Sequence, residues 1–212
     1  MNLGQLFVLE GGEGVGKTTI ATQLKELLDP QEFVFVREPG GTPLGMELRR
    51  LLLDSTIQIS PECELLLFMT ARFVVFEKVI GPALLAGKHV ITDRLDASTY
   101  AYQIRGRQMP KLENLFWAMR EQYLELPGGA LIEPFYIWFK LDPEIGSERI
   151  RVDGRETNHL DLESTEFHRR VYEGYKYFIP RMSRYATVDA SRSRDEVYGE
   201  VESIILKITG LL

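Results

Sequence analysis

A glycine-rich segment close to the N-terminus places the strongest constraint on how this chain folds. Residues Gly11–Thr18 read GGEGVGKT and match the pattern G-x-x-x-x-G-K-[ST]. The apolar run Leu6–Glu10 before them predicts a buried strand, and Thr18–Leu28 carries apolar residues at helical spacing. A glycine-rich turn between a strand and a helix is typical of a phosphate-binding loop in a βα unit.

The chemistry of phosphate binding explains the composition of this loop. Glycines let backbone N–H groups point at phosphate oxygens, and the N-terminus of the following helix adds partial positive charge. Lys17 is expected to reach the β- and γ-phosphates of a nucleoside triphosphate, and the hydroxyl of Thr18 is expected to hold Mg²⁺. The residues predicted to bind this nucleotide are Gly11, Gly12, Gly14, Val15, Gly16, Lys17, Thr18 and Thr19.

Strand-like and helix-like segments alternate along the rest of the chain. The further expected strands are Phe33–Val36, His89–Thr92, Phe135–Leu141 and Ala186–Val188. The further expected helices are Leu44–Leu53, Pro61 to about Leu85, Lys111–Leu126, Pro143–Val152, Thr165–Ser183 and Arg194–Ile208. This alternation predicts a three-layer α/β fold with a five-stranded parallel sheet and helices on both faces. We expect one domain over residues 1–212, with ligands at the carboxyl ends of the strands.

Composition excludes several classes of function. The chain has 212 residues, is 44% hydrophobic and 26% charged, and has a formal net charge of -6. This balance is typical of a globular domain, and its acidic sign argues against nucleic acid or an anionic membrane as the partner. A single cysteine, Cys63, excludes an internal disulfide and a multi-cysteine zinc site. With no signal-like or membrane-spanning apolar run, the expected location is the cytoplasm.

Arg72 stands out because it lies within Leu65–Phe76, a predicted helix that is apolar on almost every side. A buried guanidinium needs either a carboxylate partner or a ligand that offers an anion or a carbonyl. The sequence leaves both alternatives open. The same apolar surface is also a candidate face for a symmetric dimer.

Other charged residues follow the predicted strands at the edge where phosphates collect. Asp93 and Arg94 come directly after the third strand, and Arg37 closes the second, with Arg49 on the next helix. Asp93 is suited to a position near Mg²⁺, and Arg94 to a phosphoryl oxygen. Arginines that converge on one edge repel each other unless an anion lies between them. A second phosphate group, belonging to an acceptor, meets that requirement.

Four segments carry a resemblance to a known family, namely EGGEGVGKTT from Glu10, REPGGT from Arg37, FMTAR from Phe68 and DRLDASTYAYQ from Asp93. In their order and spacing they resemble thymidylate kinases of the bacterial type, which belong to the P-loop nucleoside monophosphate kinases. The resemblance is specific up to Gln103 and looser beyond it. It implies transfer of the γ-phosphoryl group of ATP to dTMP, giving dTDP, with Mg²⁺ and in a homodimer.

The resemblance also assigns roles to single residues. It implies that Phe68 stacks on thymine, that Arg72 and Gln103 bind the polar edge of the base, and that Glu13 meets the 3′-hydroxyl. It places Arg37, Arg49 and Arg94 around the acceptor phosphate and Tyr102 against the deoxyribose. The full expected dTMP site is Glu13, Arg37, Pro39, Arg49, Phe68, Arg72, Arg94, Ser98, Thr99, Tyr102 and Gln103, and the expected metal site is Thr18 and Asp93. Asp189–Arg192 is the expected slot for adenine.

The family also implies a lid, here about residues 149–160, that brings cations to the transferring phosphoryl group. The phosphate-binding loop has no basic residue before Lys17, so the lid is expected to supply this charge. The residues predicted to act in catalysis are Lys17, Glu13, Arg94, Arg149, Arg151 and Arg155. The usual Asp-Arg pair of the family, a few residues beyond Gly154, is absent, and this chain has Glu156-Thr157-Asn158-His159 instead. The sequence does not separate the roles of the lid arginines.

The sequence leaves two other functions open. One is a kinase for a broader or modified set of acceptors, such as 5-hydroxymethyl-dUMP, or for a nucleoside. Arginines directed at an acceptor phosphate argue against a nucleoside acceptor. The other is a nucleotide-binding module without catalytic activity.

Overall fold

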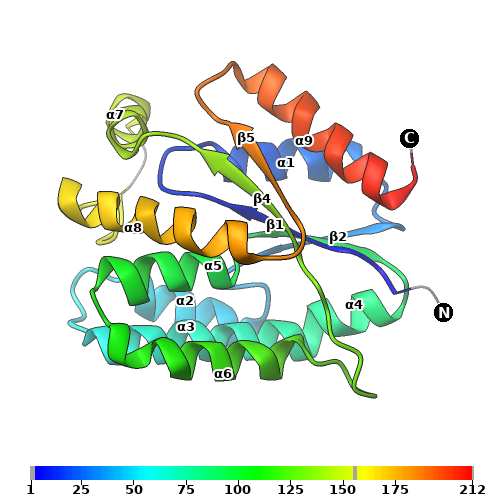
Figure 1. Ribbon diagram of the computed structural model, residues 1–212, viewed down its shortest axis with the longest axis horizontal. Helices are drawn as coiled ribbons and strands as arrows, with labels where there is room; N and C mark the ends of the chain where they lie inside the picture. The colour runs from blue at the N-terminus through cyan, green and yellow to red at the C-terminus, as the bar shows by residue number, and fades with distance from the viewer. Residues whose placement is uncertain (1–2, 155–156, 212) are drawn as a thin grey trace.

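The computed structural model describes residues 3–154 and 157–211. Within these ranges five parallel strands form one sheet in the order β2-β3-β1-β4-β5 (Figure 1). The strands are β1 (Leu6–Glu10), β2 (Phe33–Arg37), β3 (His89–Asp93), β4 (Phe135–Lys140) and β5 (Tyr185–Asp189). The predicted five-stranded parallel sheet is therefore confirmed.

Helices cover both faces of this sheet, as the sequence predicts. The α-helices are α1 (Lys17–Leu27), α2 (Pro43–Leu53), α3 (Pro61–Val75), α4 (Gly81–Leu85), α5 (Asp96–Thr99), α6 (Glu113–Leu124), α7 (Pro143–Asp153), α8 (Thr165–Phe178) and α9 (Arg194–Thr209). The tighter or wider helical segments are η1 (Phe76–Ile80, π), η2 (Tyr100–Gly106, π), η3 (Pro110–Leu112, 3₁₀) and η4 (Ile179–Arg181, 3₁₀). No described helix is long and apolar enough to cross a bilayer.

Strand β1 divides the core into two layers because successive side chains of a strand point to opposite faces. Leu6 and Val8 pack into the layer that includes α3, α6 and α8. Phe7 and Leu9 pack into the layer beneath α1 and α9. All of β1 is buried. The loop that follows β1 is thus anchored by a strand that both layers hold in place.

Helix starts follow local rules that the sequence contains. Thr42, Ser60 and Ser193 each accept a hydrogen bond from a backbone N–H in the first turn of the helix that follows. Proline at the first position of α2 and α3 suits a helix start, because the missing N–H would have had no helical partner there. These caps fix where the helices begin relative to the carboxyl ends of the strands.

The long helix predicted from Pro61 to about Leu85 is continuous, but its backbone changes within that length. The π-helical segment η1 separates α3 from α4. Pro82 follows directly and has no N–H to donate to the carbonyl four residues earlier. The π-helical turn η1 lies just before Pro82, where the backbone hydrogen bonds change from the α-helical to the wider π-helical pattern.

The sequence did not predict the helical stretch formed by α5 and η2. Residues 96–104 are all buried, polar ones included, so the stretch has no solvent-exposed face and no amphipathic period to reveal it. It packs against α8 and carries Ser98, Thr99, Tyr102 and Gln103 toward the cavity described below.

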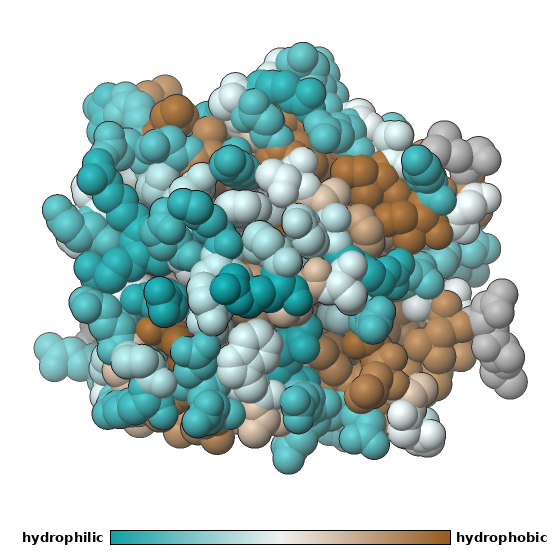
Figure 2. Space-filling view, in the orientation of Figure 1, coloured by the Kyte–Doolittle hydropathy of each residue, from teal (hydrophilic) through white to brown (hydrophobic). Residues whose placement is uncertain are grey.

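Hydrophilic side chains dominate the left part of the face in Figure 2, over α7 and α8, while hydrophobic ones gather on the right. Exposed ion pairs account for part of the hydrophilic region, for example Arg169 with Glu144 between α8 and α7. Exposed pairs of this kind contribute little to stability because water screens them. The helices α7 and α8 therefore present a solvated surface outside the cavity.

Candidate active site

A cavity of about 1160 Å³ opens at the carboxyl ends of β1 and β3. This exceeds the usual volume of a site for one small ligand, so two ligands can share it. One side is formed by the phosphate-binding loop, α7 and the loop after β5. The other side is formed by the segment after β2, by α3 and by the buried stretch α5–η2. The cavity lies where ligands bind in parallel α/β sheets.

The phosphate-binding loop needs glycine at two positions in particular. Gly14 has φ +69°, and a Cβ there would lie 2.1 Å from the carbonyl oxygen of Gly146 on α7. Gly16 has φ +92° and forms the N-cap of α1. Side chains are strained at such positive φ values. The loop therefore holds its N–H groups at the helix N-terminus, where an anion is stabilised.

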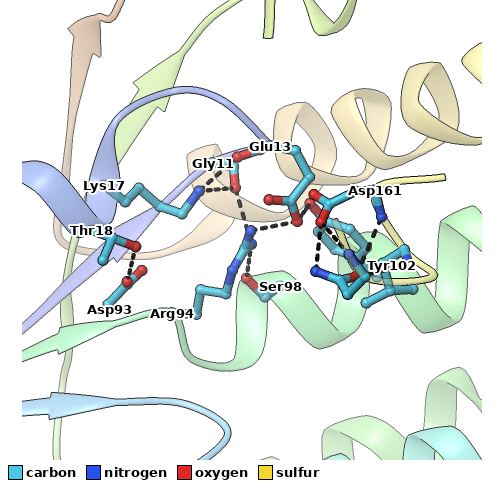
Figure 3. A network of polar contacts seen from close by, with 12 residues as sticks. Gly11, Glu13, Lys17, Thr18, Asp93, Arg94, Ser98, Tyr102 and Asp161 are labelled. Carbon is cyan, nitrogen blue, oxygen red and sulfur yellow. Dashed lines mark hydrogen bonds and ion pairs between the residues drawn. The ribbon is translucent and has the colours of Figure 1, made fainter. Parts of the chain in front are cut away.

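Lys17 is buried against this loop. Its Nζ donates hydrogen bonds to the carbonyl oxygens of Gly11, at 2.9 Å, and Gly12, at 2.6 Å (Figure 3). Burial, followed by the nearby charge of Arg94, lowers the pKa of Lys17 to about 8. A phosphate that approaches this ammonium would offset both effects.

Thr18 and Asp93, the two residues expected to hold Mg²⁺, lie side by side. Thr18 Oγ1 donates a hydrogen bond of 2.7 Å to Asp93 Oδ2, and Arg37 Nε lies 3.8 Å from the same oxygen. A hydroxyl and a carboxylate are the hard oxygen ligands that Mg²⁺ prefers. Among the described residues no group of three acidic, His or Cys side chains could hold a metal ion. These two residues therefore fit Mg²⁺ that completes its shell with phosphate oxygens and water.

Arg94 links the phosphate-binding loop to the stretch α5–η2. Its guanidinium donates to Glu13 at 2.7 Å, to the Gly11 carbonyl at 3.1 Å and to Ser98 at 3.0 Å. Its φ of 76° is unusual for a residue other than glycine. Burial lowers the pKa of Arg94, but the charges of Glu13, Tyr102, Tyr175 and Asp93 together outweigh burial, so this pKa lies well above its ordinary value.

Tyr102 also reaches Glu13 from the side of the cavity opposite the loop. Its hydroxyl donates a hydrogen bond of 2.8 Å to Glu13 Oε1. Burial and then the Glu13 charge raise the pKa of Tyr102 well above its ordinary value. The phenol is therefore neutral and acts as a donor. Hydrogen bonds thus join Glu13 to both Arg94 and Tyr102, and all three residues line the cavity.

Three predicted arginines converge at this edge. Arg37 and Arg49 line the cavity together with Arg94. Arg49 donates to the carbonyl oxygen of Pro39 at 3.1 Å. Burial, and then the charge of Arg37, lowers the pKa of Arg49 to about 10. Mutual repulsion of this kind favours an anion between the guanidinium groups.

Arg72 has the carboxylate partner that one of the two alternatives required. Its Nε donates to Glu38 Oε2 at 2.8 Å, and its other N–H groups reach Thr99 Oγ1 and the Leu95 carbonyl. Both members of the pair are almost completely buried. Burial raises the pKa of Glu38 to about 7, and the guanidinium of Arg72 limits that rise. Arg72 and Phe68 nevertheless line the cavity, so the ion pair does not remove Arg72 from the site.

The arginines predicted for the lid lie in different places. Arg149 lines the cavity and donates to the carbonyl oxygen of Ala190 at 2.8 Å, beside the expected adenine slot. Arg151 instead pairs with Glu148 on the exposed surface and does not line the cavity. Arg155 lies outside the described residues. The described end of the lid brings Asn158 to the cavity, where its side-chain amide donates to Asp161.

Two further residues of this network were not predicted from the sequence. Glu10, at the end of β1, is fully buried and accepts hydrogen bonds from Ser98 and from the hydroxyl of Tyr175. Tyr175 on α8 in turn lies 3.1 Å from Arg94. A carboxylate inside an apolar strand is a signal that could have identified Glu10. No local signal distinguishes Tyr175 from other helical tyrosines.

Comparison with known proteins identifies the family. The family model "Thymidylate kinase" matches residues 9–201. The thymidylate kinase of Gloeobacter violaceus is 38% identical over 200 residues, which are 92% of each chain. That of Synechococcus sp. (strain JA-3-3Ab) is 41% identical over 93% of each chain. That of Hahella chejuensis is 35% identical over 99% of this chain and 100% of its own. The expected resemblance is confirmed, and the chain belongs to the thymidylate kinase family.

Proposed function

We propose that this protein transfers the γ-phosphoryl group of ATP to dTMP, giving ADP and dTDP. The observation that carries the proposal is one cavity with a phosphate-binding loop on one side and three arginines on the other. The loop fits a triphosphate, and the arginines fit the phosphate of a nucleotide acceptor. The names of the relatives supply the identity of that acceptor.

ATP would bind along the loop side of the cavity. The N–H groups of the loop and the Nζ of Lys17 would hold its β- and γ-phosphates, and Thr18 and Asp93 would hold Mg²⁺. Mg²⁺ would neutralise charge that develops on the phosphoryl oxygens. The adenine would lie against Arg149 and the loop around Ala190, which contact each other and line this end of the cavity.

The acceptor would bind on the opposite side. Phe68 would stack on thymine, Arg72 and Gln103 would bind its polar edge, and Ser98 and Thr99 lie close to them. Arg37, Arg49 and Arg94 would surround its phosphate, with Pro39 beside Arg49. Glu13 would accept from the 3′-hydroxyl, and the ring of Tyr102 would fill the space that a 2′-hydroxyl requires.

In this arrangement the guanidinium of Arg94 lies between the two phosphate positions. Its contact with the Gly11 carbonyl places it against the loop, and its contact with Ser98 places it on the acceptor side. Charge stabilisation and positioning are the main demands of phosphoryl transfer. Closure of the lid over residues 149–160 would exclude water and add further positive charge. Arg151 would contribute only after it leaves Glu148.

We further propose that the enzyme is a cytoplasmic homodimer that uses the exposed side of α3. Leu66 is 45% exposed on this largely apolar helix. An apolar helical face of this kind suits an isologous contact between two copies. Sedimentation equilibrium of the purified protein would give the mass of two chains.

Initial rates with a panel of acceptors test the activity. Purified protein with ATP and Mg²⁺ would be offered dTMP, dUMP, 5-hydroxymethyl-dUMP, dCMP, dGMP and thymidine. The proposal expects dTMP to have the highest kcat/KM. A better rate with another monophosphate would favour the broader or modified-base kinase. Absence of both ADP and dTDP, despite ATP binding, would favour a non-catalytic binding module.

A further inference from the structure

Gln103 is almost completely buried in η2, yet it lines the acceptor side of the cavity. Its amide has two different ends, because the oxygen only accepts and the nitrogen only donates hydrogen bonds. Which end faces the cavity decides which atom of a base it can recognise. The orientation of this amide is set by its hydrogen bonds on the side away from the cavity.

The carboxylate of Glu64 on α3 lies directly behind this amide. Gln103 Nε2 donates a hydrogen bond of 2.7 Å to Glu64 Oε1. Glu64 is itself buried, at 3% exposure. No described residue donates a hydrogen bond to Gln103 Oε1. The oxygen is therefore the end of the amide that is available to a ligand.

Arg107 fixes the direction of this hydrogen bond. Its Nη2 lies 3.1 Å from Glu64 Oε2, and its Nε lies 3.4 Å from Oε1. A guanidinium can only donate, so both oxygens of Glu64 act as acceptors. His159, from the lid segment, lies 3.6 Å from Oε2. An amide that meets such a carboxylate must present its NH₂, because its oxygen would face another acceptor.

We propose that Glu64 is a positioning residue that holds the amide oxygen of Gln103 toward the cavity, and that this selects pyrimidines with an N3–H. This inference rests on the proposed function. Thymine and uracil carry a hydrogen at N3, whereas cytosine has a lone pair there. The fixed oxygen of Gln103 accepts from the first two bases and opposes the third. The Glu64–Gln103 pair thus discriminates dTMP from dCMP without direct contact between Glu64 and the base.

Glu64→Gln is the sharpest substitution, because it keeps the size of the side chain. Arg107 would hold the oxygen of the new amide and leave its NH₂ toward Gln103. Gln103 would then rotate to present its own oxygen to that NH₂, and its nitrogen would face the cavity. The wild-type ratio of kcat/KM for dTMP over dCMP should fall by roughly tenfold or more.

Glu163→Gln is the matched control. Glu163 is the other carboxylate that pairs with Arg107, but it has no described contact with Gln103. The dTMP-to-dCMP ratio of this variant should stay within about twofold of wild type. A ratio that is unchanged in Glu64→Gln, with both rates lowered equally, would mean a structural role only and would overturn the inference.

Wild-type protein provides an independent measurement if Glu64→Gln does not fold. In 3-deaza-dTMP a C–H replaces the N3–H, so its kcat/KM should be about tenfold or more below that of dTMP. Equal values would overturn the inference. Calorimetric Kd values for dTMP, dCMP and 3-deaza-dTMP separate this question from catalysis. Selective binding of dTMP by the wild type that is weakened in Glu64→Gln, without turnover, would refute the proposed function and support the inference, whereas equal Kd values for the three nucleotides would overturn the inference.

Discussion

Thr18 Oγ1 lies 2.7 Å from Asp93 Oδ2, and this hydrogen bond joins the first turn of α1 to the last residue of β3. The two residues are 75 positions apart in sequence. Asp93 ends β3 and Thr18 follows the loop after β1, and these two strands pair in parallel. The sheet thus brings together the two oxygen-bearing side chains that we propose hold Mg²⁺.

Thr18→Val should raise the Mg²⁺ concentration needed for half-maximal activity by roughly tenfold or more, because it removes one oxygen ligand and keeps the shape of the side chain. Thr22→Val is the matched control, since Thr22 lies one turn further along α1 and is exposed. Magnesium titrations of both variants at saturating ATP check this. An unchanged Mg²⁺ requirement in Thr18→Val would exclude Thr18 as a ligand.

The pKa of Lys17, lowered to about 8 mainly by burial, predicts a change of ATP affinity at alkaline pH. Below pH 8 the ammonium is charged and attracts phosphate, and above pH 8 it loses its proton in the free enzyme. The KM for ATP should therefore rise as the pH increases from 7 to 9.5. Unfolded chains keep this proton up to about pH 10.4. Between pH 8 and 10 the unfolded chain therefore holds a proton that the folded chain has lost, so the titration of Lys17 makes the free energy of unfolding increase with pH. The expected rise in KM does not come from unfolding caused by this residue.

Lys17→Ala should abolish phosphoryl transfer and remove this alkaline rise in KM, while Lys25→Ala should match wild type. Lys25 is an exposed lysine on the same helix. Steady-state kinetics across this pH range, with circular dichroism to check folding, provide the measurement. If Lys17→Ala is fully active, the phosphate-binding loop does not act through this lysine.

The sequence predicted the parts of the site that depend on local backbone structure. The loop Gly11–Thr18, the strand before it and the helix after it form one contiguous unit, so its motif contains most of the information. Partners that are distant in sequence were not predictable in the same way. Glu38 lies 34 residues from Arg72, and Tyr175 lies 165 residues from Glu10. Only the packing of the sheet and helices brings such pairs together.

Helical phase explains why the predicted lid arginines separate. Arg149 and Arg151 are two positions apart on α7, and side chains with this spacing point about 200° apart around the helix. One faces the cavity and the other faces solvent beside Glu148. The sequence placed both on one segment but did not specify which face of that helix meets the cavity.

The buried pair of Arg72 and Glu38 predicts a pH-dependent stability when one partner is removed. Arg72→Met keeps roughly the volume of the side chain but leaves Glu38 without its partner in the core. This should lower the free energy of unfolding by about 3 kcal/mol at neutral pH. The folded-state pKa of Glu38 is already raised by burial, and loss of the guanidinium raises it further. An acid with a raised pKa in the folded state loses stability as the pH rises through that pKa. Urea unfolding of Arg72→Met should therefore show stability that falls from pH 5 to pH 8.

The double variant Arg72→Met, Glu38→Gln is the control for this slope. It removes both charges, so its stability should exceed that of Arg72→Met at pH 8 and depend less on pH. Kinetics add a second readout, because Arg72→Met should raise the KM for dTMP far more than that for ATP. Equal changes in both KM values would assign Arg72 a structural role alone.

The position of Arg149 predicts an effect that is confined to ATP. Its guanidinium lies 2.8 Å from the Ala190 carbonyl at the end of the cavity far from the acceptor side. Arg149→Ala should raise the KM for ATP by roughly tenfold, because one wall of the adenine slot is lost, and should leave the KM for dTMP within about twofold. Arg151→Ala, on the solvent face, should change the KM for ATP much less than Arg149→Ala does. If Arg151→Ala lowers kcat more than it changes this KM, then Arg151 leaves Glu148 when the lid closes. Two-substrate kinetics on the three proteins separate these outcomes. If Arg149→Ala lowers kcat with an unchanged KM for ATP, then Arg149 acts on the transferring phosphoryl group and does not bind adenine.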